Sequence, residues 1–320
     1  MKILITGASG FLGSWICRVL SINHEVIALV RPESIPYRLK GIDSIKIINR
    51  KAAFWHECII ETKPDILILA DWWGVDNKYR NDKKQFENID RILELVKAAK
   101  KVQVNTIIGI GSQAEIGPVS YVIKEDSPDN PSTVYGHVKV KTREEISRFL
   151  NHSKCRFVWM RIFSSYGPLD TGNWLIPKLV DTLTAGKKME LTNCEQEWNY
   201  LHAYDLALAF EVVINTKSIN SIVNVGNTKT INLKSAILEI ANQLDSLHLL
   251  DFGAVGYRDD QVMKLEPNCE KLITSGWEPI IEFESGIKQT VLWLQRDKTE
   301  VLITKHGEKI ILNLPVRPYT

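Results

Sequence analysis

The feature that most constrains the fold is a glycine-rich turn near the N-terminus, between a short apolar strand and a helix. We expect the strand at Lys2–Thr6 and the helix at Phe11–Leu20, joined by the sequence GASGFLG. Glycines at this spacing let the chain turn tightly, let the backbone approach a pyrophosphate and let the helix pack closely on the sheet. The helix N-terminus also directs free amide groups toward phosphates. We therefore expect a dinucleotide here, and a glycine turn without a ligand is the alternative. The residues expected to hold it are Gly7, Gly10, Phe11, Leu12 and Gly13.

Strand-like apolar runs then alternate with helix-like segments through the first half of the chain. Between two of these runs, residues 84–100 place apolar side chains at helical spacing. Alternation of this kind predicts an α/β fold of the Rossmann type, a doubly wound parallel sheet covered by helices on both faces. The further expected strands are Glu25–Val30, Asp65–Ala70, Asn105–Ile110 and Arg156–Ile162.

The regular alternation stops after Tyr166-Gly167-Pro168, which predicts a boundary between two domains. We expect residues 1–165 to form the dinucleotide-binding domain, to which 220–226 return, and residues 166–295 to form mainly a smaller α+β substrate-binding domain. Residues 296–320 contain two apolar runs on either side of Lys305-His306-Gly307-Glu308, which predicts a β-hairpin. An isolated hairpin is marginally stable, so this one is expected to pack on the body of the protein or on another subunit.

Composition and charge exclude several classes of protein. The net charge is +2 over 320 residues, which does not indicate binding to nucleic acid or to an anionic membrane. The sequence holds no apolar run of the roughly 18 residues that a membrane span needs, and no signal peptide, so we expect a cytoplasmic protein. The five cysteines are widely spaced and form no CxxC pair, so buried neutral thiols are expected rather than disulfides or a metal site.

Tyr135 and Lys139 lie four residues apart in YGHVK, on one face of an expected helix. A free tyrosine has a pKa of about 10 and is a poor acid or base at neutral pH. A neighbouring ammonium group stabilises the phenolate and so lowers the pKa of the hydroxyl toward the range that catalysis at neutral pH needs. Ser112 follows directly after an expected parallel strand, at the sheet edge where such folds present catalytic groups. The three residues therefore predict hydride-transfer chemistry with a nicotinamide cofactor.

Arg31 ends the second expected strand, where a carboxylate would hold the ribose hydroxyls of NAD. An arginine at this point can instead pair with the 2′-phosphate of NADP. We therefore favour NADP(H), with NAD(H) as the alternative if Arg31 is simply solvated.

Taken in order, these motifs resemble those of the extended short-chain dehydrogenase/reductases that act on nucleotide sugars. The resemblance runs from Met1 to about Leu294. It rests on GASGFLG, Asn88, Ser112, YGHVK, RIFSSYGP from Arg161, EQEWNYLHAYD from Glu195, NVG from Asn224, YRDDQVM from Tyr257 and GWEP from Gly276.

The resemblance implies a role for individual residues. Ser112 would hydrogen-bond the sugar oxygen, Tyr135 would be the acid or base, and Lys139 would hold the nicotinamide ribose. Ser164 stands where relatives usually have an asparagine. Gln196, Trp198 and Asn199 match a substrate-side segment in which many relatives have an arginine and an aspartate, and these two departures put phosphate contacts there in doubt. Trp72 and Trp73 could stack on a ligand or pack in the interior, and Arg258 could grip a pyrophosphate or be solvated. The expected cofactor contacts also include Ala70, and the expected substrate contacts are Trp73, Gln113, Ser164, Gln196, Trp198 and Arg258.

The residues after Ser112 bear on the reaction. Dehydratases of this family carry an Asp-Glu pair there, whereas this chain has Gln113 and Ala114, which cannot transfer the protons of an elimination. We expect a 4-ketoreductase that acts on an NDP-4-keto-6-deoxyhexose, because Arg31 favours a consumed NADPH and because GSQAE and FGAVGYRDDQVM resemble reductases making dTDP-fucose-type or CDP-dideoxyhexose sugars. A 4-epimerase with retained NAD is the alternative, and a non-catalytic dinucleotide sensor is a third possibility. The resemblance also implies a homodimer.

Overall fold

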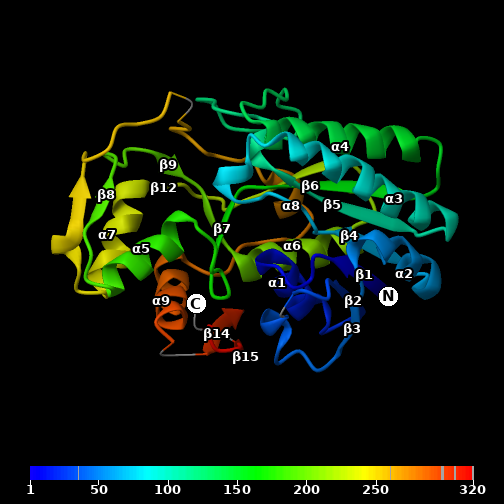
Figure 1. Ribbon diagram of the computed structural model, residues 1–320, viewed down its shortest axis with the longest axis horizontal. Coiled ribbons are helices and arrows are strands. Elements are labelled where there is room, and N and C mark those ends of the chain that lie inside the picture. Colours follow the sequence, from blue (N-terminus) through cyan, green and yellow to red (C-terminus); the bar gives the residue numbers. More distant parts are fainter. Residues whose placement is uncertain (35, 260, 297–298, 306–307, 319–320) are drawn as a thin grey trace.

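The computed structural model describes residues 1–34, 36–259, 261–296, 299–305 and 308–318. Its centre is a seven-stranded parallel sheet with the strand order β11-β6-β5-β4-β1-β2-β3 (Figure 1). The strands are β1 (Lys2–Thr6), β2 (Glu25–Val30), β3 (Ile45–Asn49), β4 (Ile66–Leu69), β5 (Thr106–Ser112), β6 (Arg156–Ile162) and β11 (Ile222–Val225). The chain runs outward from β1 through β2 to β3 and then crosses back to β4 on the other side of β1, so a crevice opens at the carboxyl ends of β1 and β4. The predicted doubly wound α/β fold is confirmed.

Alternate side chains of the strands enter two separate cores, as the two-residue period of a strand requires. On one face, Ile3 and Ile5 pack with α1 (Phe11–Leu20) and α6 (Ala203–Asn215). On the other face, Leu4 packs with α2 (Trp55–Thr62), α3 (Glu87–Lys101) and α4 (Val134–Leu150). Figure 1 shows α3 and α4 side by side along the sheet, opposite α1 and α6.

Two elements of the sheet region were not predicted. The edge strand β3 has a largely exposed and half-exposed pattern, so its sequence lacks the run of buried residues that marks the inner strands. Helix α2 is only eight residues long. The segment predicted as a helix from residue 84 begins as a 3-10 turn at Lys83–Phe86, because the Asp82 side chain accepts a hydrogen bond from the Lys84 amide and starts the turn there.

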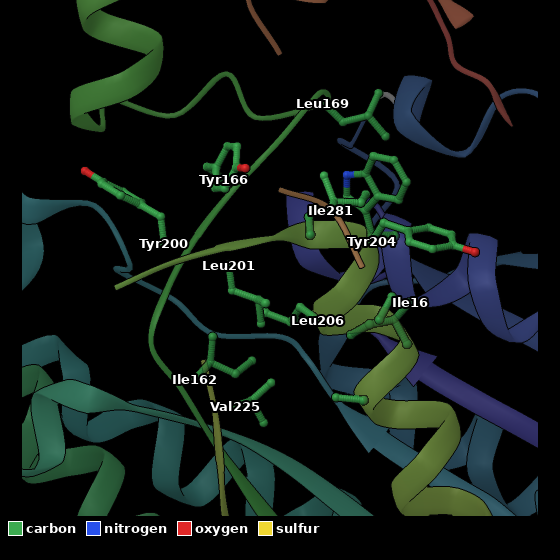
Figure 2. Close-up of a cluster of buried hydrophobic side chains, with 14 of the residues drawn as sticks. Ile16, Ile162, Tyr166, Leu169, Tyr200, Leu201, Tyr204, Leu206, Val225 and Ile281 are labelled. Carbon is green, nitrogen blue, oxygen red and sulfur yellow. The ribbon is translucent and has the colours of Figure 1, made fainter. Parts of the chain in front are cut away.

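The smaller lobe holds the helices α5 (Leu175–Thr184), α7 (Leu233–Gln243) and α9 (Phe283–Leu294), whereas the short helix α8 (Glu270–Ile273) packs against β11 of the central sheet. Its short strand pairs are β7 (Ser164–Tyr166) with β10 (Tyr200–His202), β8 (Met189–Leu191) with β13 (Leu250–Phe252), and β9 (Glu197–Trp198) with β12 (Ile231–Asn232). One continuous apolar core joins this lobe to the sheet. Figure 2 shows Ile16 of α1 and Ile162 of β6 in the same cluster as Tyr200 and Leu201 of β10. The two lobes are therefore fixed to each other by packing.

The C-terminal segment forms the antiparallel pair β14 (Glu300–Lys305) and β15 (Glu308–Asn313), while the turn residues His306 and Gly307 lie outside the described residues. Beyond β15, Leu314 enters the main core, and the Arg317 guanidinium binds both oxygens of Asp181 in α5 at 2.6 and 2.7 Å. The Arg18 side chain of α1 also donates to the Asn313 carbonyl at 3.4 Å. The tail thus contacts both lobes.

All five cysteines are free, and four of them are buried. Burial raises the pKa of each thiol, to about 12 for Cys17 and Cys269 and to about 11 for Cys155. They are neutral thiols, as their spacing predicted. Across the described residues, no helix is long and apolar enough to cross a membrane.

Candidate active site

The glycine turn after β1 forms a cradle that side chains would fill. Gly7 has a φ of +65°, and a Cβ added there would lie 2.7 Å from the Ala70 carbonyl oxygen, at the end of β4. A Cβ on Gly13 would lie 2.3 Å from the Gly7 carbonyl oxygen, so this glycine allows α1 to pack close to the turn. The first turn of α1 contains Phe11 and Leu12 and carries no charged group that would compete with an anion. This geometry fits the pyrophosphate of a dinucleotide.

Ser112 and Tyr135 meet at the carboxyl end of β5. Helix α4 begins directly after Thr133, whose side-chain oxygen accepts a hydrogen bond from the Gly136 amide at 3.1 Å and places Tyr135 in the first turn. Tyr135 is buried, and its hydroxyl hydrogen-bonds to the Ser112 side chain. The structure therefore brings these two predicted residues together.

The electrostatics at Tyr135 favour the neutral phenol. Burial raises its pKa and Glu115 raises it further, whereas Arg80 and the Ser112 hydrogen bond act in the opposite direction. The side chain is thus a proton donor whose acidity depends on nearby cations.

Lys139 lies one helical turn after Tyr135 and is also buried. Its Nζ donates to the Ile110 carbonyl at 2.7 Å and lies 3.5 Å from the centre of the Trp72 ring. Burial lowers the pKa of Lys139 to about 7, a nearby Arg91 lowers it, and Glu115 opposes the change. The ammonium group therefore faces an enclosed site, close to the Tyr135 ring at 5.7 Å from its centre.

Arg80 places a second cation next to Tyr135. Its guanidinium lies 5.2 Å from the centre of the Tyr135 ring and 5.8 Å from that of Trp174, the residue before α5. The Arg80 carbonyl also accepts a hydrogen bond from the Tyr135 amide at 2.8 Å. This side chain therefore lies between Tyr135 and Trp174 of the smaller lobe.

The loop after β4 is held by Asn88 of α3. The Asn88 side chain accepts a hydrogen bond from the Trp73 amide at 2.9 Å and donates one to the Trp73 carbonyl at 3.2 Å. Trp72 turns toward Tyr135, with ring centres 6.0 Å apart, whereas Trp73 packs against Tyr79. The structure thus brings Trp72 next to Tyr135 and Trp73 next to Tyr79, and the substrate contact expected of Trp73 stays a prediction.

Two of the predicted substrate residues bind each other. The Trp198 indole Nε1 donates to the Ser164 hydroxyl at 2.8 Å. Gln196 is 3% exposed, and among the described residues its side-chain carbonyl meets no hydrogen-bond partner. Gln113 is half-buried next to Ser112, whereas Arg258 is exposed on the segment before α8. The structure thus groups Ser164 with Trp198 and leaves Arg258 at the surface.

A depression of about 360 Å³ lies in the smaller lobe near Arg80. Its wall includes Trp174, which Arg80 contacts, and it extends to polar side chains of α5 and β8. The lining side chains include Asn77, Trp174, Lys178, Glu190 and Thr192. Trp174 therefore contacts Arg80 beside Tyr135 and also lines this depression.

Arg31 lies at the end of β2, exposed and 3.7 Å from a Glu33 carboxylate oxygen. Its charge also acts on Arg91 of α3, whose pKa falls to about 10, mainly through burial and further through Arg31. Arg91 forms an ion pair with Asp71, directly after β4. Two guanidinium groups thus face the carboxyl ends of β2 and β4.

Comparison with known families decides the class of the protein. Residues 3–226, which include the glycine turn, Ser112, Tyr135 and Lys139, match the NAD dependent epimerase/dehydratase family. The chain belongs to this family. Among curated relatives, the dTDP-D-glucose 4,6-dehydratase of Bos taurus is 25% identical over 99% of this chain and 94% of its own length. The CDP-abequose synthase of Salmonella typhimurium is 24% identical over 90% of this chain and 96% of its own length.

Solved structures of the epimerase/dehydratase fold superimpose along most of the chain. The UDP-N-acetylglucosamine 4-epimerase of Methanobrevibacter ruminantium has a TM-score of 0.83 at 19% identity and covers 93% of this chain and 99% of its own. The dTDP-glucose 4,6-dehydratase of Bacillus anthracis, solved with NAD, has a TM-score of 0.80 at 19% identity, with coverages of 93% and 97%. These likenesses show the fold.

Within this epimerase/dehydratase family member, the sequence alone missed two groups beside the catalytic residues. Arg80 carried no local signal, because its contacts with Tyr135 and Trp174 join segments that are far apart in the chain. Glu115, by contrast, stands three residues after Ser112, the spacing of a capping box, in which the two residues bond each other's backbone. That spacing was the available signal for Glu115.

Proposed function

We propose that the protein reduces the C4 ketone of a nucleotide-linked 4-keto-6-deoxyhexose at the expense of NADPH. The observation that carries the proposal is the buried Tyr135 hydroxyl, which is hydrogen-bonded to Ser112 and has two cations close to it. A ketone at this point would meet a hydrogen-bond donor and a proton donor together.

Each residue has a distinct task in this reaction. Ser112 donates a hydrogen bond to the ketone oxygen, and Tyr135 transfers its proton to that oxygen as negative charge develops. Lys139 and Arg80 stabilise the phenolate that remains. NADPH, held at the glycine turn with its nicotinamide ribose on Lys139, would supply the hydride.

The residues after Ser112 support reduction over dehydration. Elimination of water needs an acid and a base close to the sugar, and Gln113 and Ala114 can serve as neither. Ala114 is also buried, and its carbonyl oxygen would lie 2.1 Å from a Cβ on Gly136, so α4 packs directly against this turn. We therefore assign this chain a reaction different from that of its dehydratase relatives.

Arg31 and Arg91 support NADP(H) as the cofactor. The exposed Arg31 guanidinium lies only 3.7 Å from Glu33 and would pair with the negative charge of a 2′-phosphate, while Arg91, which Asp71 already pairs, adds positive potential nearby. The 4-epimerase reaction remains the second candidate, since the same Ser112, Tyr135 and Lys139 would serve it with a retained NAD.

The smaller lobe is proposed to bind the nucleotide of the substrate, in the depression beside Trp174. Polar side chains and an aromatic ring there suit a base and its ribose. The expected substrate contacts Gln113, Ser164, Gln196, Trp198, Trp73 and Arg258 remain part of this proposal. We also propose a homodimer that forms through α3 and α4. Phe86, directly before α3, is an apolar side chain that is 42% exposed on that side of the sheet.

The proposal is tested by adding NADPH and dTDP-4-keto-6-deoxyglucose to the purified protein while nicotinamide absorbance is followed. Stoichiometric loss of NADPH with formation of a 6-deoxyhexose product is expected. If NADPH is not consumed and the protein carries tightly held NAD, the epimerase is the better assignment, and intact NDP-hexoses become the substrates to screen. A CDP-linked keto sugar serves as the second substrate, because CDP-abequose synthase is among the relatives.

A further inference from the structure

Glu115 is a fully buried carboxylate directly behind the catalytic serine. It ends the 3-10 turn Gln113–Glu115 that follows β5. Its Oε1 accepts a hydrogen bond from the Ser112 amide at 2.7 Å and one from the Trp159 indole at 2.9 Å. The Ser112 side chain in turn accepts one from the Ala114 amide at 3.2 Å. The bonds to Glu115 and Ala114 together fix the position of Ser112 next to Tyr135.

The second oxygen of Glu115 binds two arginines. Oε2 lies 3.0 Å from Arg143 Nη1 and 3.5 Å from Arg161 Nε. Asp129 neutralises the same arginines from the other side, at 2.5 Å from Arg143 and 3.6 Å from Arg161. Two carboxylates and two guanidinium groups thus form a charge-balanced cluster. A buried cluster of this kind gives little net stability, because desolvation offsets the attraction.

The negative charge of Glu115 also acts on Lys139 and raises the pKa of that lysine. The charged and titratable groups around Lys139 are Arg91 of α3, Tyr135 of its own helix and Glu115. Burial and Arg91 both disfavour the ammonium form, and Glu115 is the group that favours it. A structural cluster alone would not need to reach either catalytic residue.

We propose that Glu115 is a positioning residue, which holds Ser112 against the Tyr135 hydroxyl and provides the negative charge opposite Lys139. The assignment rests on the proposed function for the roles of Ser112 and Lys139. It implies that one carboxylate sets both the geometry of the hydrogen-bond donor and the charge of the ammonium group.

The test uses the full chain with Glu115→Gln, Glu115→Asp and the control Asp129→Asn. Asp129 contacts the same two arginines, so its variant perturbs the cluster without touching Ser112. Glu115→Gln keeps an acceptor for the Ser112 amide but loses the negative charge and turns an NH2 group toward Arg143, so the turn is expected to shift and kcat to fall about 10- to 100-fold. It is also expected to shift the alkaline limbs of kcat/KM and of NADPH affinity to lower pH, because Lys139 loses its proton more easily. Glu115→Asp keeps the charge, but its side chain is too short for the Ser112 contact. It should therefore lower kcat while the alkaline limbs of kcat/KM and NADPH affinity stay at the wild-type pH.

Asp129→Asn should lower the melting temperature as Glu115→Gln does, with kcat and the pH limb unchanged. If Asp129→Asn reproduces both effects, or if Glu115→Gln changes neither, the positioning role is wrong. NADPH affinity is measured separately by nicotinamide fluorescence across pH. Absence of turnover in the wild type would therefore contradict the proposed reaction, while the binding titration would still decide the role of Glu115.

Discussion

The Lys139 ammonium nitrogen lies 3.5 Å from the centre of the Trp72 ring, which covers it on the side of the loop after β4. A cation over an indole face is stabilised by the ring, yet it has exchanged most of its water for that contact. Burial of the Lys139 charge is thus expected to lower the stability of the fold.

Lys139→Met is expected to stabilise the protein at and below neutral pH while abolishing activity. In the unfolded chain this lysine keeps its proton up to a pKa of 10.5, and in the folded site only up to about 7. Between these values the unfolded state binds more protons, so the lysine's destabilising effect is complete below pH 7 and fades toward pH 10.5. The variant should gain a few kcal/mol at pH 6 and progressively less above pH 7. Urea unfolding at pH 6, 8 and 10 measures this, and an equal gain at every pH would contradict it.

Tyr135→Phe should remove the proton donor and leave the fold intact. We expect turnover to fall by about 100- to 10,000-fold, with cofactor affinity nearly unchanged. Tyr121→Phe is the matched control, since Tyr121 is 45% exposed, and it should keep full activity. Initial rates with NADPH and the keto sugar give the comparison, and a Tyr135→Phe enzyme with wild-type rates would point to the non-catalytic alternative.

Arg31→Asp should reverse the choice of cofactor. Loss of a charged hydrogen bond to the 2′-phosphate is expected to weaken NADPH binding about 10- to 100-fold and to leave NADH binding largely unchanged. Glu33→Gln removes the ion-pair partner of Arg31 and should keep the NADPH preference. Fluorescence titration with each nucleotide measures both constants, and an equal loss for the two nucleotides would count against a phosphate contact.

Arg80→Ala should alter the acidity of the catalytic hydroxyl. Because Arg80 lowers the pKa of Tyr135, its removal raises that pKa and makes the hydroxyl a weaker acid. We expect kcat at neutral pH to fall about tenfold and the pH at which Tyr135 deprotonates to move upward. Arg80→Lys keeps the charge and should restore much of the profile. Matching pH profiles for the alanine and lysine variants would exclude an electrostatic role.

Arg317→Ala should loosen the C-terminal tail. The variant loses two hydrogen bonds to the Asp181 carboxylate and one to the Leu294 carbonyl. The Asp181 side chain is 49% exposed. Since solvent screens such a pair, we expect a loss of only about 1 kcal/mol of stability. Thermal unfolding measures the loss. A chain ending at Gln295 should unfold at a still lower temperature. If the measured mass of that shortened chain still corresponds to two copies, the tail does not build the subunit contact.

Local sequence signals were sufficient for much of this structure. Strand β1 and helix α1 begin and end at the predicted residues, because apolar periodicity and glycine punctuation are properties of short segments. Strand β3 escaped prediction because its edge position leaves it partly exposed and removes that signal. Local sequence also could not separate the roles of Trp72 and Trp73, because they are identical residues at adjacent positions. The loop that Asn88 holds in place directs Trp72 toward Tyr135.

The sequence by itself determined that a glycine turn would join β1 to α1 and that Tyr135 and Lys139 would share a helix face. Both follow from backbone geometry over a few residues. The tertiary structure decided which charges surround that pair: Arg80 from one loop, Arg91 from α3 and Glu115 from the turn after β5. Proton affinity depends on burial and on distances between groups in space, and these arise only when separate elements pack together.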